Sequence, residues 1–218
     1  MLASQSMESV RKRGPAARPV GRGRGGARPQ QAAQKAKSHA LIVESASRLF
    51  RERGFAGATV DEVMAAAGLT RGGFYAHFED KVDLAAEALA VAFEGSIANL
   101  FGADMPREPR SWRERAAKRY LTEAHLDNTG GGCPLPALGG DVARGEPELR
   151  SATEKQLARV LDELEHRVGG DAAGARQRSI AFLATCVGAM TLARSVEDRA
   201  LAREILNACR RELTKDSE

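Results

Sequence analysis

Apolar residues along this chain recur with the period of α-helices from residue 38 onward. The first stripe has the i, i+4, i+7 and i+8 spacing of one helix face. Its members are Ile42, Ala46, Leu49 and Phe50. A longer stripe of the same kind consists of Leu84, Ala88, Leu89, Ala92, Phe93, Ile97, Leu100 and Phe101. No stretch of convincing length alternates apolar and polar residues as a strand would, so the sequence predicts an all-α fold.

Capping residues and glycines predict where the helices begin and end. Thr59 and Glu62 form a capping box, because the Thr side chain can accept the Glu62 amide while the Glu side chain reaches back. Gly54 and Gly68 stand where a left-handed residue ends a helix. Thr70 and Asp80 are expected to cap the next two helices, and a second box, from Ser111 to Glu114, is expected to open a later helix. The nine helices predicted in this way lie at about 38–53, 59–67, 70–77, 80–102, 111–127, 134–143, 147–168, 175–196 and 198–213.

The charge is unevenly distributed. The 218 residues carry a net charge of +4, and 43% of them are hydrophobic, which is typical of a globular protein. Residues 1–37 hold nine basic residues and one acidic residue, whereas acidic residues outnumber basic ones in the remainder. This tail is rich in Gly, Pro, Gln and Ala, so we expect it to be disordered. It is either a basic arm for a polyanion such as DNA or a passive leader.

Several classes of protein are not expected. Three cysteines are too few for a disulfide framework and favour a reducing, cytoplasmic setting. The longest nearly apolar run, 180–193, is shorter than the roughly 20 residues that span a bilayer, so no membrane association is predicted. The four histidines are isolated, and no nucleotide-binding loop or nucleophile motif is present. We therefore expect no metal, no cofactor and no enzymatic activity.

Two short helices joined at Gly68 have the spacing of a helix-turn-helix. Apolar residues able to form its small core are Val63, Ala67, Leu69, Phe74 and Phe78. Gly72 and Gly73 each cost about 1 kcal/mol relative to Ala inside a helix. A helix that serves only packing would not contain both, so they favour close approach of the backbone to a DNA groove. The alternative is an ordinary helical hairpin with exposed polar residues.

Residues 38–84 resemble the N-terminal domain of the TetR/AcrR family of transcriptional regulators. The resemblance rests on the run from Thr59 to Leu84, above all on Gly-x-Phe-Tyr-x-His-Phe-x-x-Lys, which ends at Lys81. It implies a homodimeric, ligand-responsive regulator, most often a repressor, that binds a palindromic operator in double-stranded DNA. Residues 38–84 would then form a three-helix DNA-binding domain and residues 85–218 a helical domain for effector binding and dimerisation. The alternative is an all-α protein-interaction module without DNA binding.

The same resemblance implies DNA-contacting roles for individual residues. Thr59 and Lys81 are expected at phosphates, and Tyr75 and His77 at the DNA backbone. Residues expected at base edges or nearby phosphates are Thr70, Arg71 and Gly72, and Gly73 is expected in the same interface. Gly73 is commonly a Thr or Ser in the family, so this chain lacks one possible side-chain contact. The physical argument agrees for Arg71, the one long donor of the recognition helix, because guanine offers it two acceptors.

The C-terminal part offers three further predictions. Effector-pocket candidates, each of which could equally be core, are Phe93, Ile97, Phe101, Trp112, Tyr120 and Met190. Cys133 is predicted at a helix N-terminus, where the helix dipole would lower its thiol pKa. Some family members with a similar Gly-Cys-Pro-Leu run sense electrophiles or oxidants there; the alternative is a buried packing residue. Residues 175–213 are apolar around most of a helix, which predicts a homodimer interface.

Overall fold

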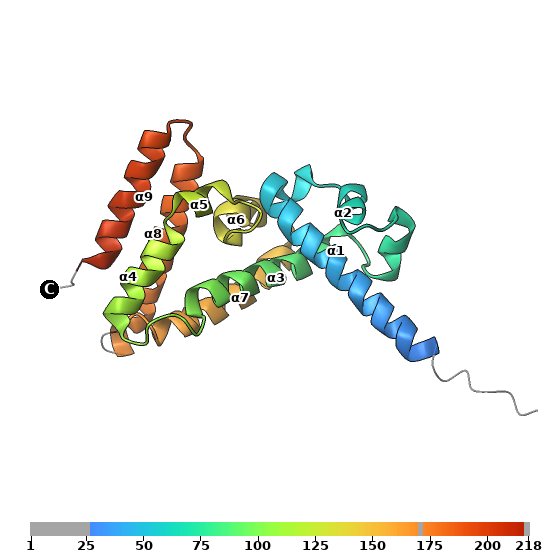
Figure 1. Cartoon of the computed structure of the whole chain (residues 1–218), viewed down its shortest axis with the longest axis horizontal. Helices are drawn as coiled ribbons and strands as arrows, with labels where there is room; N and C mark the ends of the chain where they lie inside the picture. The colour runs from blue at the N-terminus through green and yellow to red at the C-terminus, as the bar shows by residue number, and fades with distance from the viewer. Residues whose placement is uncertain (1–26, 170–171, 216–218) are drawn as a thin grey trace, which may run out of the picture. The chain divides into compact units, whose positions relative to one another are not determined.

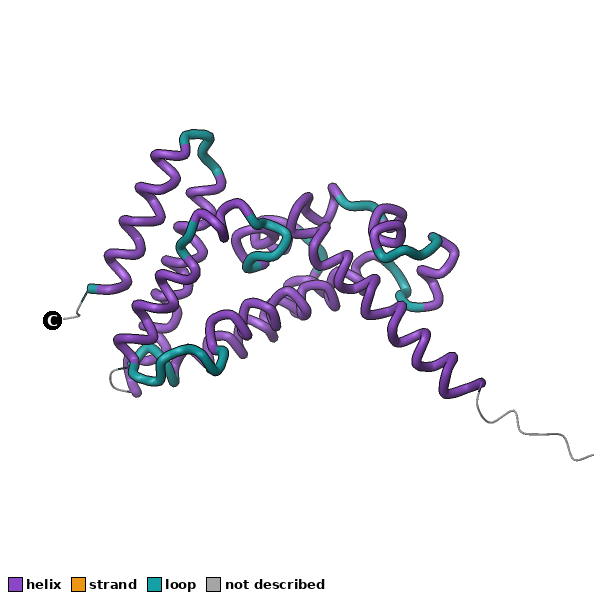
Figure 2. Tube along the Cα trace, viewed as in Figure 1, coloured by secondary structure: helices purple, strands orange, loops and turns teal. Residues whose placement is uncertain are grey.

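The computed structural model describes residues 27–169 and 172–215, and within these ranges it contains helices and no strand (Figures 1 and 2). The predicted all-α class is thus confirmed. Its elements are α1 (Ala27–Gly57), α2 (Val60–Ala66), the 3-10 helix η1 (Arg71–Ala76), α3 (Lys81–Phe101), α4 (Pro109–Tyr120), α5 (Glu123–Asp127), α6 (Pro134–Arg144), α7 (Pro147–Glu165), α8 (Ala172–Arg194) and α9 (Arg199–Thr214).

Two of the predicted helix starts and the glycine stop at Gly68 are confirmed, whereas Gly54 is a non-helical residue within α1, which continues to Gly57. Thr59 Oγ1 accepts the Glu62 amide at 3.2 Å, and Glu62 Oε2 accepts the Thr59 amide at 2.8 Å, which completes the capping box of α2. Asp80 caps α3 by accepting the amides of residues 82 and 83 at 2.8 and 2.9 Å. Gly54 and Gly68 have φ values of 76° and 71°, in the left-handed region that favours glycine.

The N-terminal tail differs from the prediction. The structure begins α1 at Ala27, so the disorder predicted for residues 27–37 is wrong. This stretch is rich in Ala, Gln and Lys, which form helices well without contributing to a core. Residues 1–26 lie outside the described part of the chain. The residues before Ala36 belong to a different unit from those that follow, and the description below concerns the unit from Ala36 onward.

The expected single helix at 111–127 is in fact two. Glu108, rather than Ser111, caps α4 by accepting the amides of residues 110 and 111 at 2.9 and 2.7 Å. Bonds from the Ser111 hydroxyl and amide lower the pKa of Glu108 to about 2. The helix ends at Tyr120, and Thr122 then caps α5 through the amide of His125 at 3.1 Å. Periodicity missed this break because both pieces keep an apolar face.

One continuous hydrophobic core fills the second unit. At its N-terminal end Val63 of α2 and Phe74 of η1 pack with buried residues of α1 such as Phe50. Helix α3 carries the core onward through Leu84, Leu89 and Phe93 to α4 and α8. Because α3 spans the boundary predicted between residues 84 and 85, a movement of this helix would involve both parts.

By length and composition alone, helix α3 could cross a membrane. The prediction of no membrane association considered the run at 180–193 and overlooked this helix. In the fold, however, the apolar face of α3 packs into the hydrophobic core. Its remaining faces carry exposed acidic residues, Asp83, Glu87 and Glu94. These features are those of a core helix.

Candidate nucleic-acid interface and adjoining cavity

The two short helices of the predicted helix-turn-helix are held at a fixed angle by their shared core. Gly68 makes the turn, and the Leu69 amide then donates to the Met64 carbonyl at 2.9 Å. Val63 and Phe74 are almost completely buried between the helices. The second helix, η1, is a 3-10 helix, and Thr70 begins it without a side-chain hydrogen bond, so the capping predicted for Thr70 is wrong. Gly72 and Gly73 weaken the α-helical preference of this segment.

Most of the residues predicted to contact DNA lie at the surface of this motif. Those that are exposed are Thr59, Thr70, Arg71, Gly72 and Tyr75, whereas Gly73 and His77 are half-buried. Tyr75 is 74% exposed, which is unusual for an aromatic residue that packs. The Arg71 guanidinium pairs with Asp61 of α2 at 2.8 Å, and both side chains are more than half exposed. Thr70, Arg71, Gly72 and Tyr75 thus lie on one exposed segment at η1, and Thr59 is exposed at the start of α2.

Lys81 lies in a different environment. Its ammonium donates to the carbonyl of Phe55 and lies 5.8 Å from the centre of the Phe50 ring. Burial lowers the pKa of Lys81. In this position Lys81 joins the end of α1 to the start of α3. A contact between Lys81 and a DNA phosphate remains a prediction, and it would compete with the hydrogen bond from Lys81 to the Phe55 carbonyl.

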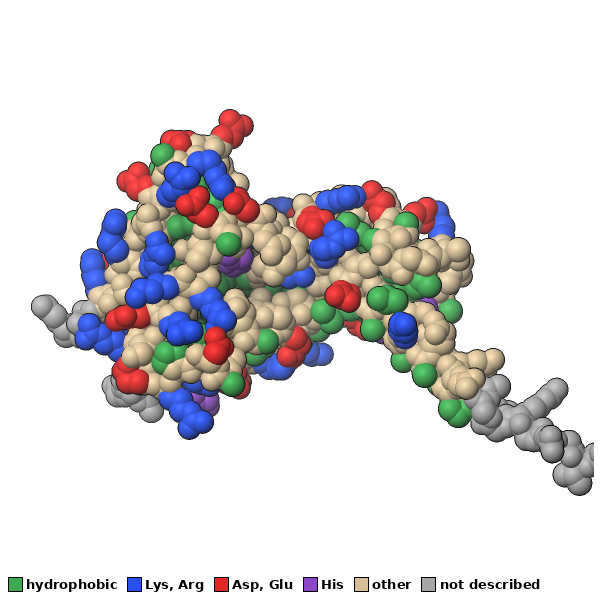
Figure 3. All heavy atoms as spheres, in the orientation of Figure 1, with side chains coloured by type: hydrophobic (Ala, Val, Ile, Leu, Met, Phe, Trp, Pro, Cys, Tyr) green, Lys and Arg blue, Asp and Glu red, His purple; other side chains and the backbone are tan. Residues whose placement is uncertain are grey.

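Charge alone does not mark this surface as a DNA-binding one. Residues 38–82 hold five basic and six acidic residues. Figure 3 shows basic and acidic side chains interspersed over the face in view. No field of one sign therefore steers a polyanion to this part of the chain, and recognition would depend on the local geometry of η1.

A cavity of about 330 Å³ opens where α3, α4 and α5 meet the loop that precedes α6. Its lining is about evenly polar and apolar and includes Ser96, Asn99, Arg119, Tyr120, Thr122, His125, Asn128 and Cys133. Of the predicted pocket residues, Tyr120 lines this cavity. Phe93, Ile97 and Phe101 border a much smaller void of about 10 Å³, and Trp112 and Met190 are completely buried in the core. The polar lining residues were missed because they carry no apolar periodicity.

The Tyr120 hydroxyl is a buried group without an ordinary hydrogen bond. The residue is 3% exposed, and its oxygen meets no partner at hydrogen-bonding geometry. It lies near enough to the Cys133 thiol for each group to influence the pKa of the other. The Cys133 thiol is therefore its neighbouring polar group, and a sulfur partner satisfies a buried hydroxyl only weakly.

Cys133 occupies the predicted N-cap of α6, but its predicted low pKa is wrong. The residue is 7% exposed, and burial raises the pKa of its thiol. Interactions with Tyr120, with the Leu135 backbone and with Ser96 lower the pKa, yet they do not outweigh burial. The structure therefore presents Cys133 as a neutral thiol. Cys186 is likewise buried.

His125 organises the loop between α5 and α6. Its Nε2 accepts the Cys133 amide at 3.0 Å, and its Nδ1 is 2.7 Å from the Tyr120 carbonyl. An amide can only donate and a carbonyl can only accept, so the ring proton is on Nδ1. Burial lowers the pKa of His125, which keeps the ring neutral at pH 7.

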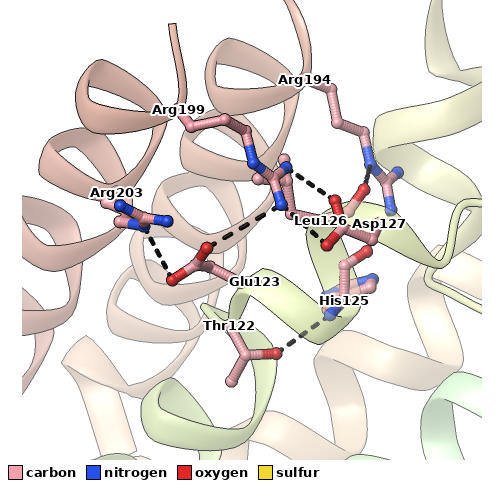
Figure 4. A network of polar contacts seen from close by, with 8 residues as sticks. All are labelled: Thr122, Glu123, His125, Leu126, Asp127, Arg194, Arg199 and Arg203. Carbon is pink, nitrogen blue, oxygen red and sulfur yellow. Dashed lines mark hydrogen bonds and ion pairs between the residues drawn. The ribbon is translucent and has the colours of Figure 1, made fainter.

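Helix α5 is anchored to α8 and α9 (Figure 4). Arg194 donates to the carbonyls of His125 and Leu126 at 2.7 and 3.3 Å. The Arg199 guanidinium donates two hydrogen bonds to the Asp127 carboxylate, at 2.7 and 2.8 Å. Bidentate arginine–carboxylate pairs of this kind fix orientation as well as distance. Helix α5 is thus held on one side by the C-terminal helices.

Three consecutive glycines allow the loop to pass between His125 and α1. A Cβ on Gly132 would lie 2.6 Å from His125 Nε2, and one on Gly130 would lie 3.0 Å from Arg48 Cγ. On the far side, Arg51 of α1 donates to the Gly132 carbonyl at 2.6 Å. The sequence predicted a helix break here but did not reveal the contacts with α1, because they join residues about 80 positions apart.

Comparison with known proteins identifies the class of this motif. Residues 42–88 match the family described as "Bacterial regulatory proteins, tetR family". The chain is 38% identical over 85 residues to the HTH-type transcriptional regulator AcrR of Shigella flexneri, and 36% identical over 76 residues to the HTH-type transcriptional repressor DhaR of a Mycobacterium species, strain GP1. These matches cover 38% of this chain and 38% of AcrR, and 35% of this chain and 34% of DhaR.

The fold of the rest of the chain is similar to that of solved regulators. A TetR transcriptional regulator from Chloroflexus aurantiacus J-10-FL superposes with a TM-score of 0.69 at 22% identity, over 84% of this chain and 94% of that one. Residues 42–88 thus match the helix-turn-helix part of the tetR family, and the chain as a whole has the fold of the solved regulator.

The glycine loop makes a prediction about stability. Gly132→Ala should destabilise the protein by about 1–3 kcal/mol, because the new methyl group would displace the His125 ring from the Cys133 amide. Thermal unfolding would measure the change. Gly139→Ala in α6 is the matched control: a Cβ there meets nothing within 4 Å, so this variant should be as stable as the wild type or slightly more so. Equal effects of the two substitutions would contradict the contact.

The raised pKa of Cys133 predicts slow, pH-dependent alkylation. At pH 7 the thiol should react with iodoacetamide at least about tenfold more slowly than glutathione, because little thiolate is present. Its rate should still be rising at a pH where that of glutathione has levelled off. Mass spectrometry of the Cys133 peptide would follow the reaction at each pH. A rate that levels off below pH 8 would show a low pKa and would favour electrophile sensing.

Proposed function

We propose that the chain is a DNA-binding transcriptional regulator that represses by occupying a palindromic operator as a homodimer, and that a small effector in the cavity releases it. The observation that carries this proposal is the exposed set of polar residues on η1, held on the rigid core of the helix-turn-helix. The name of DhaR describes a repressor, and that of AcrR a regulator, which supports the same activity here. A cytoplasmic location goes with this role.

Gly72 supports the assignment of η1 as the DNA-reading element. A Cβ at this position would meet nothing within 4 Å, so packing inside the protein does not require a glycine here. Gly72 nevertheless makes the helix less stable than Ala would at this position. Close approach of an external surface, such as the wall of the major groove, explains the missing side chain.

Arg71 is placed to exchange partners when DNA binds. Its ion pair with Asp61 is largely exposed, and such pairs contribute little to stability. The guanidinium can therefore leave Asp61 at small cost and donate to guanine O6 and N7. In the free protein the pair holds Arg71 close to the segment where Thr70 and Tyr75 are exposed.

The second copy of the chain would cover the outer face of α8 and α9. Helix α8 buries Phe182, Cys186 and Met190 in the core, yet Ile180 and Leu192 on its other side are 49% and 58% exposed. Leu201 of α9 is 41% exposed. Gly188 leaves space on α8 for close approach, since a Cβ there meets nothing. A two-fold interface across residues 175–213 would bury this apolar face.

The cavity favours reversible binding of a small polar effector. Its volume lies within the range of ligand pockets, and side chains of its wall such as Asn99 and Thr122 supply hydrogen-bonding groups. Covalent sensing by Cys133 is the second candidate mechanism, and the position of the thiol at the cavity wall favours it. The two differ in one result: Cys133→Ser should abolish release by an electrophile but not release by a reversible ligand.

The DNA-binding role predicts a specific effect of Arg71→Ala. Duplexes would first be selected from a random pool by the wild-type protein, and affinity would be measured by fluorescence anisotropy. Arg71→Ala should cost about 1–3 kcal/mol and relax base preference at one position in each half-site. Arg115→Ala removes an exposed arginine of α4 and should leave preference unchanged. If no duplex is enriched, the chain is instead a protein-interaction module without DNA binding.

The proposed dimer predicts that a charge on the outer face of α8 separates the subunits. Leu192→Arg places a charge where apolar residues of two copies would meet, so light scattering should give the mass of a monomer. Val91→Arg is the control, because Val91 of α3 is also exposed, at 45%, and lies outside the proposed interface. A dimer that persists in Leu192→Arg at micromolar concentration would place the interface elsewhere.

A further inference from the structure

The loop of Gly130 to Gly132 touches the cavity on one side and α1 on the other. Gly131, Gly132 and Cys133 line the cavity, and the Gly132 carbonyl accepts a bond from Arg51. We propose that Arg51 is the coupling residue of this protein: its bond to Gly132 transmits the state of the cavity to the helix-turn-helix. This inference deepens the proposed function and rests on it for the meaning of the signal.

Arg51 is positioned firmly from within α1. Its Nε donates to the Ser47 carbonyl at 2.9 Å and its Nη2 to the Ser47 hydroxyl at 3.3 Å. Ser47 is itself 3% exposed. The third nitrogen, Nη1, is thereby directed at Gly132. Since the neighbouring Phe50 belongs to the core of the helix-turn-helix, a displacement of Arg51 would move α1 against that core.

On the cavity side, the loop is the part that can respond to a ligand. Helix α5 is fastened to α8 through its backbone by Arg194 and to α9 through the Asp127 side chain by Arg199. A ligand that contacts Tyr120 or the His125 ring cannot easily shift α5. It can displace the Cys133 amide from His125 Nε2, because that bond depends on the ring alone. The Gly132 carbonyl precedes this amide in the same peptide group, so it would move at the same time.

A second contact between the same parts has a different character. The Phe55 amide donates to Asp141 Oδ2 at 3.1 Å, which joins the end of α1 to α6. Asp141 is absent from the cavity lining and also pairs with Arg144. This contact can hold the two parts together whether or not the cavity is filled. Arg51 differs because its partner belongs to the cavity wall.

Coupling is reciprocal, so operator binding must also affect the cavity wall. The rate of Cys133 alkylation reports that wall directly, because the buried thiol reacts only when the loop opens. The experiment measures this rate by mass spectrometry for the full chain, with and without a saturating operator duplex selected by the wild-type protein. The variants are Arg51→Gln, Arg51→Lys and the control Arg48→Gln, which loses the same charge from the same helix and keeps its aliphatic contact with Gly130.

Operator should slow the alkylation at least about fivefold in the wild type and in Arg48→Gln, and less than twofold in Arg51→Gln. Arg51→Lys, which keeps one donor, should show partial protection. Without DNA, Arg51→Gln should react about fivefold faster than Arg48→Gln, because its loop opens more often. Strong protection by operator in Arg51→Gln, or equal rates of the two variants without DNA, would overturn the proposal.

The two hypotheses fail in different ways. If the selection enriches no duplex, DNA regulation is wrong, while the comparison without DNA still tells whether Arg51 holds the loop. If duplexes are enriched and Arg51→Gln binds one of them with full protection of Cys133, regulation of DNA stands and Arg51 is not its coupling residue. If Arg51→Gln binds no duplex, the alkylation rates of Arg51→Gln and Arg48→Gln without DNA decide whether Arg51 holds the loop.

Discussion

The hydrogen bond from the Cys133 amide to His125 is the contact on which the arrangement around the cavity depends. It orients the imidazole, whose other nitrogen is committed to the Tyr120 carbonyl, and it sets the path of the glycine loop. That path brings the Gly132 carbonyl to Arg51 on one side and the Cys133 thiol to the cavity on the other. A ring that is neutral and has one tautomer can do this; a protonated ring would have no acceptor for the amide.

Cys133 shows how burial can reverse an effect expected from local structure. The start of a helix stabilises a thiolate, and several hydrogen bonds around Cys133 act in the same direction. The cost of placing a negative charge away from water is larger, so the pKa rises. Local position therefore predicted the wrong sign because the extent of burial depends on α3, α4 and α5 together.

The helix-turn-helix separates residues that maintain the fold from residues that face outward. Val63 and Phe74 hold the two helices together, while Arg71, Gly72 and Tyr75 contribute almost nothing to that core. Because packing does not require these exposed residues, their identity can be set by a binding partner. Its nearly balanced charge means that the shape of η1, with two glycines in six residues, is its most distinctive feature.

The sequence by itself determined the helical class, most of the helix ends and the helix-turn-helix, because periodicity, caps and glycine stops act within a few residues. Thr59, Gly68 and Asp80 behave as their local chemistry predicts. Only the tertiary structure decided that Tyr120, His125 and Cys133 meet at one cavity and that Arg51 reaches Gly132. Those contacts join residues far apart in the chain, and their polar partners follow no period that a sequence pattern can reveal.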